Sequence, residues 1–261
     1  MQRPCPTRVP CRSHPLESIR NSITLPGVVA VRAGPSTASC HRVTSSHRAL
    51  YQIPDKIESP VFYWFIKGMF WPLSQIYFRQ RRRGLENLPR QGPVILAANH
   101  SSFLDPPALG TACPRKVHFL IMRTVYDLLR FRWFYIGMEA VPVSSNRQDA
   151  LALRQALRML RRGEVVGVFP EGERRTDGRI GEPRLGAALL AARSGAPVVP
   201  VGIRGAYRAL PPRGLFPKPI RLEVVFGPAL RWNGGKASRE GLERFSQRMM
   251  EAVGDLIAGD S

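Results

Sequence analysis

Short apolar runs rich in β-branched residues recur along the chain after residue 85, separated by stretches with helical periodicity. Turn residues bound these runs, as they bound the buried strands of a sheet. The runs cover Val94–Ala98, Val117–Ile121, Val165–Phe169, Val198–Ile203 and Leu222–Phe226. We predict one strand over each run.

Three stretches between or after these runs have apolar residues at helical spacing. The first begins near Asn146, a residue type that caps helices, and ends at Gly163. The second ends at Gly195, and the third begins at Ser238 and keeps its apolar stripe to Leu256. Strands that alternate with helices predict a single α/β domain with a central, mostly parallel or mixed sheet flanked by helices.

An aromatic-rich apolar segment precedes the alternating pattern. Residues 61–78, VFYWFIKGMFWPLSQIYF, contain one charged residue, Lys67, and the arginine cluster RQRRRG follows at once at 79–84. An apolar, aromatic helix beside such a cluster is typical of a helix in the membrane interface, with its guanidinium groups on lipid phosphates. The sequence therefore predicts an N-terminal interfacial helix.

Two other interpretations of this segment remain open. A helix packed on the core would have a similar composition, whereas a transmembrane helix would need a longer run than Gly68 and Pro72 leave uninterrupted. We predict a membrane-docking helical segment over 56–84 and a folded domain over 85–258. The apolar stretch Leu128–Ile136 is expected to contact lipid as well.

The first 50 residues differ in composition from the rest. They contain seven Arg, no Lys and a single acid, Glu17, and their one short apolar run does not suffice for a signal peptide. This composition predicts a disordered extension over 1–55, or a mis-assigned start upstream of the true one. An Arg-rich targeting peptide is the alternative.

The charge balance favours anionic partners. Lys and Arg total 39 against 19 acidic residues, a net charge of +20, which fits nucleic acid, anionic lipid head groups or phosphorylated substrates. Three of the four cysteines lie in the first 40 residues, and none has the spacing of a metal site or a disulfide framework. We therefore expect a protein that faces a reducing cytoplasm and binds no metal.

Two histidines lie outside the N-terminal extension. His118, inside the apolar run VHFLI, is predicted to be a packed core residue. His100 instead follows a predicted strand in the segment NHSSFLDPP, where ligand sites of α/β sheets collect. A neutral imidazole acts as a general base when its free nitrogen faces the substrate and a carboxylate holds the other nitrogen. The spacing fits His100 as base and Asp105 as its orienting carboxylate, but the same spacing also arises by chance, so it needs support from the rest of the sequence.

A second polar segment, PEGERRTDG at 170–178, also follows a predicted strand. A turn that contains glycine and arginine after a strand is suited to phosphate binding, because guanidinium groups make bidentate contacts to phosphate. Taken alone, the same segment fits an ordinary solvated loop.

Together, NHSSFLDP, FPEGER and VPVGIRG, in this order, resemble three signature blocks of the glycerolipid acyltransferase family, which includes the lysophosphatidate acyltransferases. The resemblance covers about residues 60–256 and implies the αβ acyltransferase architecture over 85–258. It implies that His100 removes the proton of the acceptor hydroxyl while Asp105 orients the imidazole.

The resemblance also implies substrate-binding residues. Glu171, Gly172 and Arg174 correspond to the acceptor-binding block, with Arg174 as the phosphate ligand. Val199 and Pro200 belong to the block on the acyl-donor side.

One further family block normally carries an arginine after a Gly-x-hydrophobic-Pro-Val run. That run corresponds to GMEAVPV at 137–143, and the candidate arginine is Arg147. The chain departs from the family pattern at Glu173, where Thr or Ser is usual, and at Arg184, where lysine is frequent. These departures leave the acceptor head group open.

The activity implied by the resemblance is transfer of a fatty acyl group from acyl-CoA or acyl carrier protein to a lysophospholipid hydroxyl, with 1-acyl-sn-glycerol-3-phosphate as the first expectation. From the resemblance, together with the charge, the cysteine pattern and the 61–84 segment, we expect a role in phospholipid biosynthesis at the cytoplasmic face of a membrane with anionic lipids, without metal, cofactor or nucleic acid. A noncatalytic, Arg-rich nucleic-acid or anionic-lipid-binding protein is the alternative. A serine hydrolase using Ser101 or Ser102 would lack a G-x-S-x-G elbow.

Overall fold

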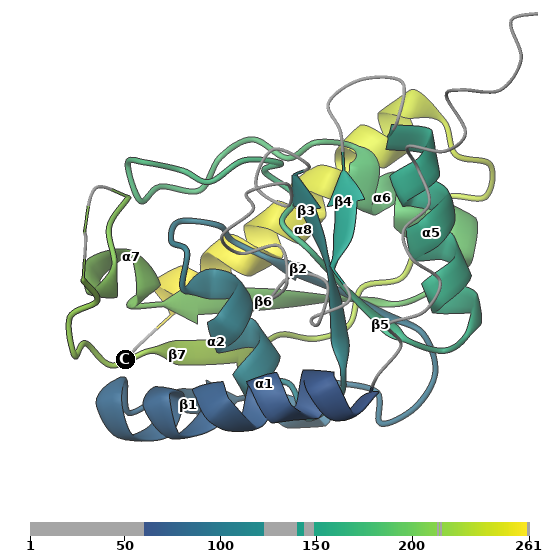
Figure 1. Ribbon diagram of the computed structural model, residues 1–261. Helices are drawn as coiled ribbons and strands as arrows, with labels where there is room; N and C mark the ends of the chain where they lie inside the picture. Colours follow the sequence, from purple (N-terminus) through teal and green to yellow (C-terminus); the bar gives the residue numbers. More distant parts are fainter. Residues whose placement is uncertain (1–59, 123–139, 144–148, 213, 215, 260–261) are drawn as a thin grey trace, which may run out of the picture. The chain divides into compact units, whose positions relative to one another are not determined.

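Seven strands of the described chain form one sheet in the order β1-β7-β6-β2-β5-β3-β4 (Figure 1). The strands are β1 (Arg81–Arg83), β2 (Val94–Ala98), β3 (Val117–Met122), β4 (Val141–Val143), β5 (Val165–Val168), β6 (Val198–Arg204) and β7 (Glu223–Phe226). Every neighbouring pair is parallel except β6 and β7. The predicted mixed α/β sheet is therefore confirmed.

The computed structural model describes residues 60–122, 140–143, 149–212, 214 and 216–259, all within one unit that spans 52–261. The extension at 1–55, the lipid-contact stretch Leu128–Ile136, the helix cap Asn146 and the candidate Arg147 lie outside the described residues. The predictions for these positions remain predictions.

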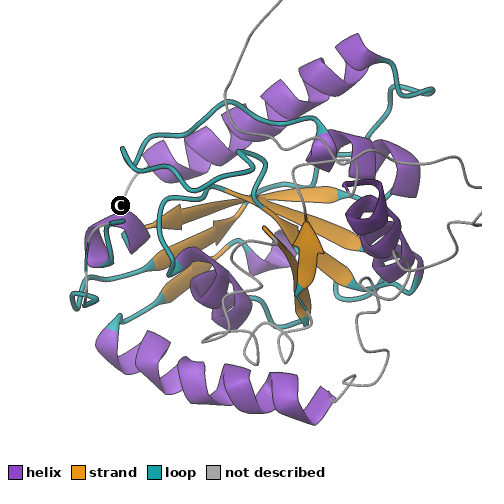
Figure 2. Ribbon diagram, turned by 45° about the horizontal axis from the view of Figure 1, so that its top comes forward, coloured by secondary structure: helices purple, strands orange, loops and turns teal. Residues whose placement is uncertain are grey.

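Helices lie on both sides of the sheet (Figure 2). They are α1 (Pro60–Pro72), which continues as the π-helical turn η2 (Leu73–Tyr77), η3 (Leu85–Asn87), α2 (Asp105–Ala112), α5 (Asp149–Arg161), α6 (Gly186–Ser194), α7 (Ala206–Ala209) and α8 (Arg239–Ala258). The three predicted helices are present as α5, α6 and α8. Gly195 ends α6 in the left-handed conformation, and the Ser238 hydroxyl caps α8 by accepting the Gly241 N–H at 3.1 Å.

Strand β2 lies near the centre of the sheet, and all five of its residues are buried. Val94, Leu96 and Ala98 point into the apolar cluster shared with α1 and α2. Ile95 and Ala97 point into a second cluster shared with α5, α6 and α8. Because helices cover both faces, this strand is a continuous apolar run instead of an alternating one.

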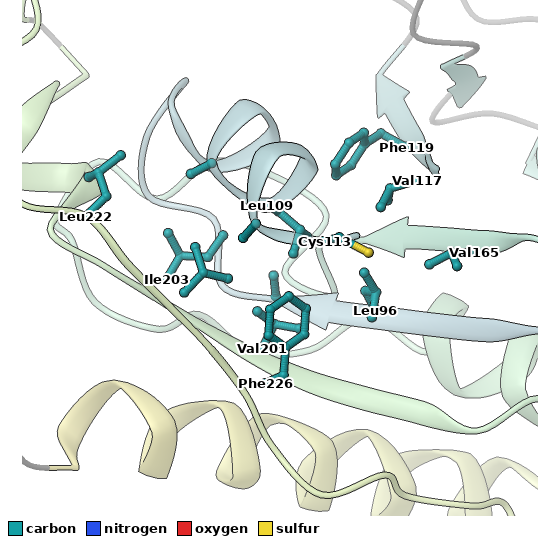
Figure 3. Packing of buried hydrophobic residues seen from close by; sticks show 14 of the residues in the cluster. Leu96, Leu109, Cys113, Val117, Phe119, Val165, Val201, Ile203, Leu222 and Phe226 are labelled. Atoms are coloured by element: carbon teal, nitrogen blue, oxygen red, sulfur yellow. The ribbon is translucent and has the colours of Figure 1, made fainter. Parts of the chain in front are cut away.

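Helix α2 is anchored in the first cluster by Leu109 and Cys113, which pack beside Leu96 and Val117 of the sheet (Figure 3). Leu109 and Cys113 are both fully buried. This anchoring matters for the site because Asp105 is the first residue of α2. The hydrophobic core thereby fixes the position of the carboxylate relative to the end of β2.

The apolar helix α1 presents two different faces. Tyr63 and Ile66 are buried against the core. On the outer face, the exposed fractions are 75% for Val61 and 65% for Phe65. The helix is therefore packed on the domain, as one sequence interpretation expects, and it also exposes apolar surface. Its position in a membrane interface stays a prediction. None of the described helices has the length and apolarity needed to cross a membrane.

The arginine cluster differs from the prediction of a helical segment over 56–84. Its residues Arg81–Arg83 form β1, the edge strand that pairs in parallel with β7. The physical reason is that β7 would otherwise expose unpaired N–H and C=O groups. The N–H of Arg81 donates to Leu222 O at 2.9 Å, and Arg83 forms an ion pair with Glu223 at 2.8 Å.

Candidate active site

The chain leaves β2 through an asparagine that is bonded to the neighbouring strand. The side-chain amide of Asn99 donates to Ile203 O at 3.1 Å, and its carbonyl oxygen accepts the Ile203 N–H at 2.8 Å. This two-way bond extends the β2–β6 pairing with a side chain. It fixes the direction in which the next residue, His100, leaves the sheet.

His100 and Asp105 meet as their spacing predicts. Asp105 Oδ2 lies 3.0 Å from His100 Nδ1 and accepts the N–H groups of Ser101 and Ser102, each at 2.7 Å. Because a carboxylate oxygen with three neighbouring nitrogens is an acceptor, Nδ1 carries the proton and Nε2 is the free base. The Asp105 side chain is fully buried, whereas His100 is 19% exposed. The imidazole can thus reach a substrate that its carboxylate cannot.

The backbone of His100 is held from both sides by the loop after β5. Its N–H donates to Glu171 Oε1 and its C=O accepts the Arg175 N–H, both at 2.9 Å. The imidazole ring stacks on Phe169, with centroids 4.2 Å apart and planes 21° apart. The two polar segments identified in the sequence therefore form one structure around the base.

Gly172 is required by the geometry of this loop. Its φ is +75°, and a Cβ at this position would lie 2.4 Å from Arg184 Cδ. Its N–H donates to Phe169 O at 3.0 Å, and the Arg184 N–H donates to Pro170 O at 2.8 Å. A side chain at 172 would both strain the backbone and displace Arg184.

Arg174 lies beside the His–Asp pair. Its guanidinium carbon is 3.6 Å from the centroid of the Phe103 ring, an arrangement typical of a cation–π contact. Burial lowers the pKa of the Arg174 guanidinium, and the negative charge of Asp105 opposes that shift. Its Nη1 is buried and has no hydrogen-bond partner among the described groups. A guanidinium with a free N–H suits an anionic oxygen of a ligand.

Residues 79–204, which contain all of these groups, match a family described as Acyltransferase. Over these residues, which make up just under half of the chain, the protein is similar to the acyltransferase family. In the solved structure of the 1-acyl-sn-glycerophosphate (LPA) acyltransferase PlsC from Thermotoga maritima, the same fold recurs with a TM-score of 0.59 and 23% sequence identity. That match covers 75% of this chain and 82% of the other.

Curated relatives of the acyltransferase domain are named 1-acyl-sn-glycerol-3-phosphate acyltransferases. The chloroplastic protein of Brassica napus is 32% identical over 155 residues, which cover 58% of this chain and 44% of the relative. The Bacillus subtilis protein is 27% identical over 146 residues, which cover 56% of this chain and 70% of the relative. The match thus spans less than half the length of the chloroplast relative.

Val199 and Pro200, which the resemblance assigns to the acyl-donor side, lie inside the central sheet. They belong to β6, where they pair with Leu96 and Ala97 of β2, and both are buried. They pair β6 with β2, the strand that ends two residues before His100. Direct contact with an acyl donor stays a prediction for these two positions, as does any role of Arg147.

The structure places the other sequence candidates plainly. His118 is buried, as expected of a core histidine, with Nε2 3.3 Å from Glu164. Ser102 is fully buried, and its hydroxyl donates to Leu210 O at 2.8 Å, an arrangement that does not present it as a nucleophile. In the described part of the chain, no group of three His, Cys, Asp or Glu side chains is arranged to hold a metal ion.

Sequence reasoning missed two features of the site. The first is Phe103, the ring on which Arg174 stacks, which is 56% exposed. The only feature of the sequence that could have indicated it is its position between His100 and Asp105. Glu171 was assigned to acceptor binding, a role that remains a prediction. In the structure its Oε1 accepts the His100 N–H and its Oε2 accepts the Gly181 N–H at 3.1 Å.

Glu171→Gln is expected to lower kcat about tenfold with little change in the KM for the acceptor. Glu171 is buried, and burial raises the pKa of its carboxyl. A glutamine accepts only one of the two N–H groups, and an unsatisfied buried donor costs about 1–3 kcal/mol. Because the substitution loosens the orientation of His100, the loss should appear in kcat. Steady-state kinetics give kcat and the acceptor KM for this variant and for a control.

The matched control is Glu182→Gln on the same loop, because Glu182 is exposed and has no role in the site. It should keep the wild-type kcat. If Glu171→Gln instead raises the acceptor KM at constant kcat, Glu171 contacts the acceptor directly and the positioning role is wrong.

Proposed function

We propose that this protein transfers a fatty acyl group from an acyl thioester to the free hydroxyl of a lysophospholipid. The acceptor is 1-acyl-sn-glycerol-3-phosphate, the compound in the names of its relatives, and the donor is acyl-CoA or acyl carrier protein. The observation that supports this most strongly is the His100–Asp105 pair at the end of β2, with Nε2 free, inside an acyltransferase domain.

The chemistry follows from the geometry of that pair. His100 Nε2 removes the proton of the acceptor hydroxyl while the hydroxyl oxygen attacks the thioester carbon. The new C–O bond forms as the C–S bond breaks, and the departing thiolate takes the proton from the imidazolium. Asp105 stabilises the imidazolium between these two proton transfers. No protein nucleophile is needed, since a thioester is already activated.

Arg174 provides the binding site for the acceptor phosphate in this proposal. Its buried, unpartnered Nη1 and its fixed stacking on Phe103 offer a preorganised donor beside the base. Phosphate binding at a distance from the reacting hydroxyl would convert binding energy into orientation. Glu173, an acid next to this arginine, would tune which head group the site prefers.

The exposed apolar face of α1 supports a location at the surface of a membrane, where lysophospholipids reside. The net charge of +20 favours a surface with anionic lipids, and the cysteine pattern favours the cytoplasmic face. The acyltransferase would then bind its acceptor without extracting it into water.

Product formation tests the proposal. The protein is incubated with a long-chain acyl-CoA or acyl carrier protein and with lysophosphatidate or monoacylglycerol, and the acylated product is measured by mass spectrometry. Arg174→Gln should raise the KM for lysophosphatidate about 10–100-fold, since a hydrogen bond to a charged group contributes about 1.5–3 kcal/mol. The KM for monoacylglycerol, which lacks the phosphate, should change little.

Arg179→Gln is the control, because Arg179 is an exposed arginine on the same loop. Equal effects of both substitutions would contradict a specific role for Arg174. Absence of acylated product with every donor and acceptor, together with salt-sensitive binding of oligonucleotides, would favour the noncatalytic alternative.

A further inference from the structure

A groove of about 670 Å³ lies between the end of α1 with η2 and the segment 216–222, and its lining does not include His100 or Asp105. Its lining residues are Pro72, Leu73, Ile76, Tyr77, Arg79 and Pro219. The walls are apolar except for Arg79. The groove is open, so a bound molecule would keep part of its surface outside it.

The two walls of the groove are bonded to each other. The Tyr77 hydroxyl donates to Pro217 O at 2.7 Å, and Arg79 Nη2 donates to Pro219 O at 3.2 Å. Leu222 N–H donates to Phe78 O at 3.1 Å, which continues the connection toward β1. Hydrogen bonds of the folded domain therefore hold the two walls of the groove together.

The backbone on one side of the groove has unusual geometry. The turn Leu73–Tyr77 is π-helical, and π-helical turns occur frequently at functional sites. Arg79 has a φ of +47°, a left-handed conformation that is uncommon for residues other than glycine. This conformation directs the chain from the helix into β1 and sets the Arg79 side chain at the mouth of the groove.

The rim of the groove exposes apolar side chains in a basic surrounding. Ile76 in the lining is 78% exposed, and Phe216, which precedes the Tyr77-bonded Pro217 in the chain, is 82% exposed. Lys218 and Arg221, which follow Phe216 in the sequence, are also exposed. The sequence contains no acid over 60–85 or over 209–222. Exposed apolar side chains together with Arg79, Lys218 and Arg221 complement an anionic lipid surface.

We propose that this groove binds one anionic phospholipid of the membrane, with its phosphate on Arg79 and an acyl chain along Leu73 and Ile76. The Phe216 ring inserts into the membrane leaflet that contains this phospholipid. This inference rests on the membrane location in the proposed function and is independent of the catalytic chemistry.

The bound lipid would also orient the site. The Lys218 N–H in the groove segment 216–222 donates to Ala209 O at 2.7 Å, and the carbonyl of the next residue, Leu210, accepts the Ser102 hydroxyl at 2.8 Å. The lipid-binding segment is therefore attached to the loop that carries His100. Binding at the groove would hold the catalytic loop at a fixed position relative to the membrane surface.

Vesicle binding of the full chain tests the proposal, with phosphatidylcholine vesicles that contain or lack phosphatidylglycerol. Arg79→Gln should weaken binding to the anionic vesicles about fivefold, since one basic residue near such a surface contributes about 1 kcal/mol. It should leave binding to pure phosphatidylcholine unchanged. Phe216→Ser should weaken binding to both vesicles about tenfold or more, because a large apolar side chain no longer leaves water.

Two substitutions elsewhere on the surface serve as controls. Ile180 is 38% exposed, and Arg239 is exposed at the start of α8. Ile180→Ser and Arg239→Gln should bind both vesicles as the wild type does. If Arg79→Gln keeps the wild-type preference for anionic vesicles, or if Phe216→Ser binds as the wild type does, the proposal is wrong.

Failure of the groove proposal can be distinguished from failure of the proposed function. Wild-type turnover without groove-dependent vesicle binding would reject the groove alone, and groove-dependent binding without turnover would reject the acyltransfer reaction alone. If Phe216→Ser raises the KM for a long-chain donor while vesicle binding is unchanged, the groove holds a substrate chain and the lipid proposal is overturned.

Discussion

His100→Ala is expected to reduce acceptor-dependent release of thiol from a long-chain acyl-CoA by about 10²–10⁴-fold, the usual contribution of a general base. In the structure the imidazole is bonded to Asp105 through Nδ1, and its Nε2 is free to accept the hydroxyl proton. The assay measures free thiol over time with lysophosphatidate as acceptor. Most of the loss should appear in kcat, because the ring acts on the reacting proton.

Folding is the necessary control for this variant. The variant loses the imidazole ring that stacks on Phe169. The backbone hydrogen bonds of residue 100 to Glu171 and Arg175 do not depend on the side chain. The melting temperature should therefore stay near that of the wild type. A folded His100→Ala protein with undiminished activity would require another base.

Asp105→Asn is expected to lower kcat on the order of 10⁴-fold, the effect of the same change in a Ser-His-Asp triad. Asp105 Oδ2 receives Nδ1–H of His100 and two backbone N–H groups, and the side chain is fully buried. The neutral amide of asparagine cannot stabilise an imidazolium as a carboxylate does. It also lets the imidazole adopt the wrong tautomer, with the proton on Nε2.

Steady-state kinetics of Asp105→Asn measure this effect, and a melting curve accompanies them. Ser101 and Ser102 also bind the carboxylate through their N–H groups, so some stability is expected to be lost. A kcat within tenfold of the wild type in folded Asp105→Asn would show that the carboxylate does not orient the base.

The central strands were predictable because burial on both faces demands continuous apolar runs. Each of the five predicted strands agrees with the structure to within about one residue at either end. The edge strand β1 was not predictable, since all three of its arginines are exposed and produce no apolar pattern. Helix α2 begins with Asp105 and two prolines, which suit a first helical turn but also suit a rigid loop.

The candidate site was predictable to the extent that its residues are close in sequence. The spacing of His100 and Asp105 was enough to suggest their contact, which the structure contains. The two N–H partners of Glu171 lie 71 and 10 positions away, and such pairings have no local sequence signal. The stacking of Arg174 on Phe103 joins two loops and was hidden for the same reason.

A single-turnover experiment tests the central claim most directly. The protein, in excess over a long-chain acyl-CoA, is mixed rapidly with or without lysophosphatidate, and free thiol is measured over the first turnover. Direct, base-catalysed transfer predicts that thiol appears only with the acceptor and in step with the diacyl product. A stoichiometric burst of thiol without acceptor would reveal an acyl-enzyme intermediate and contradict direct attack of the acceptor hydroxyl with His100 as its base.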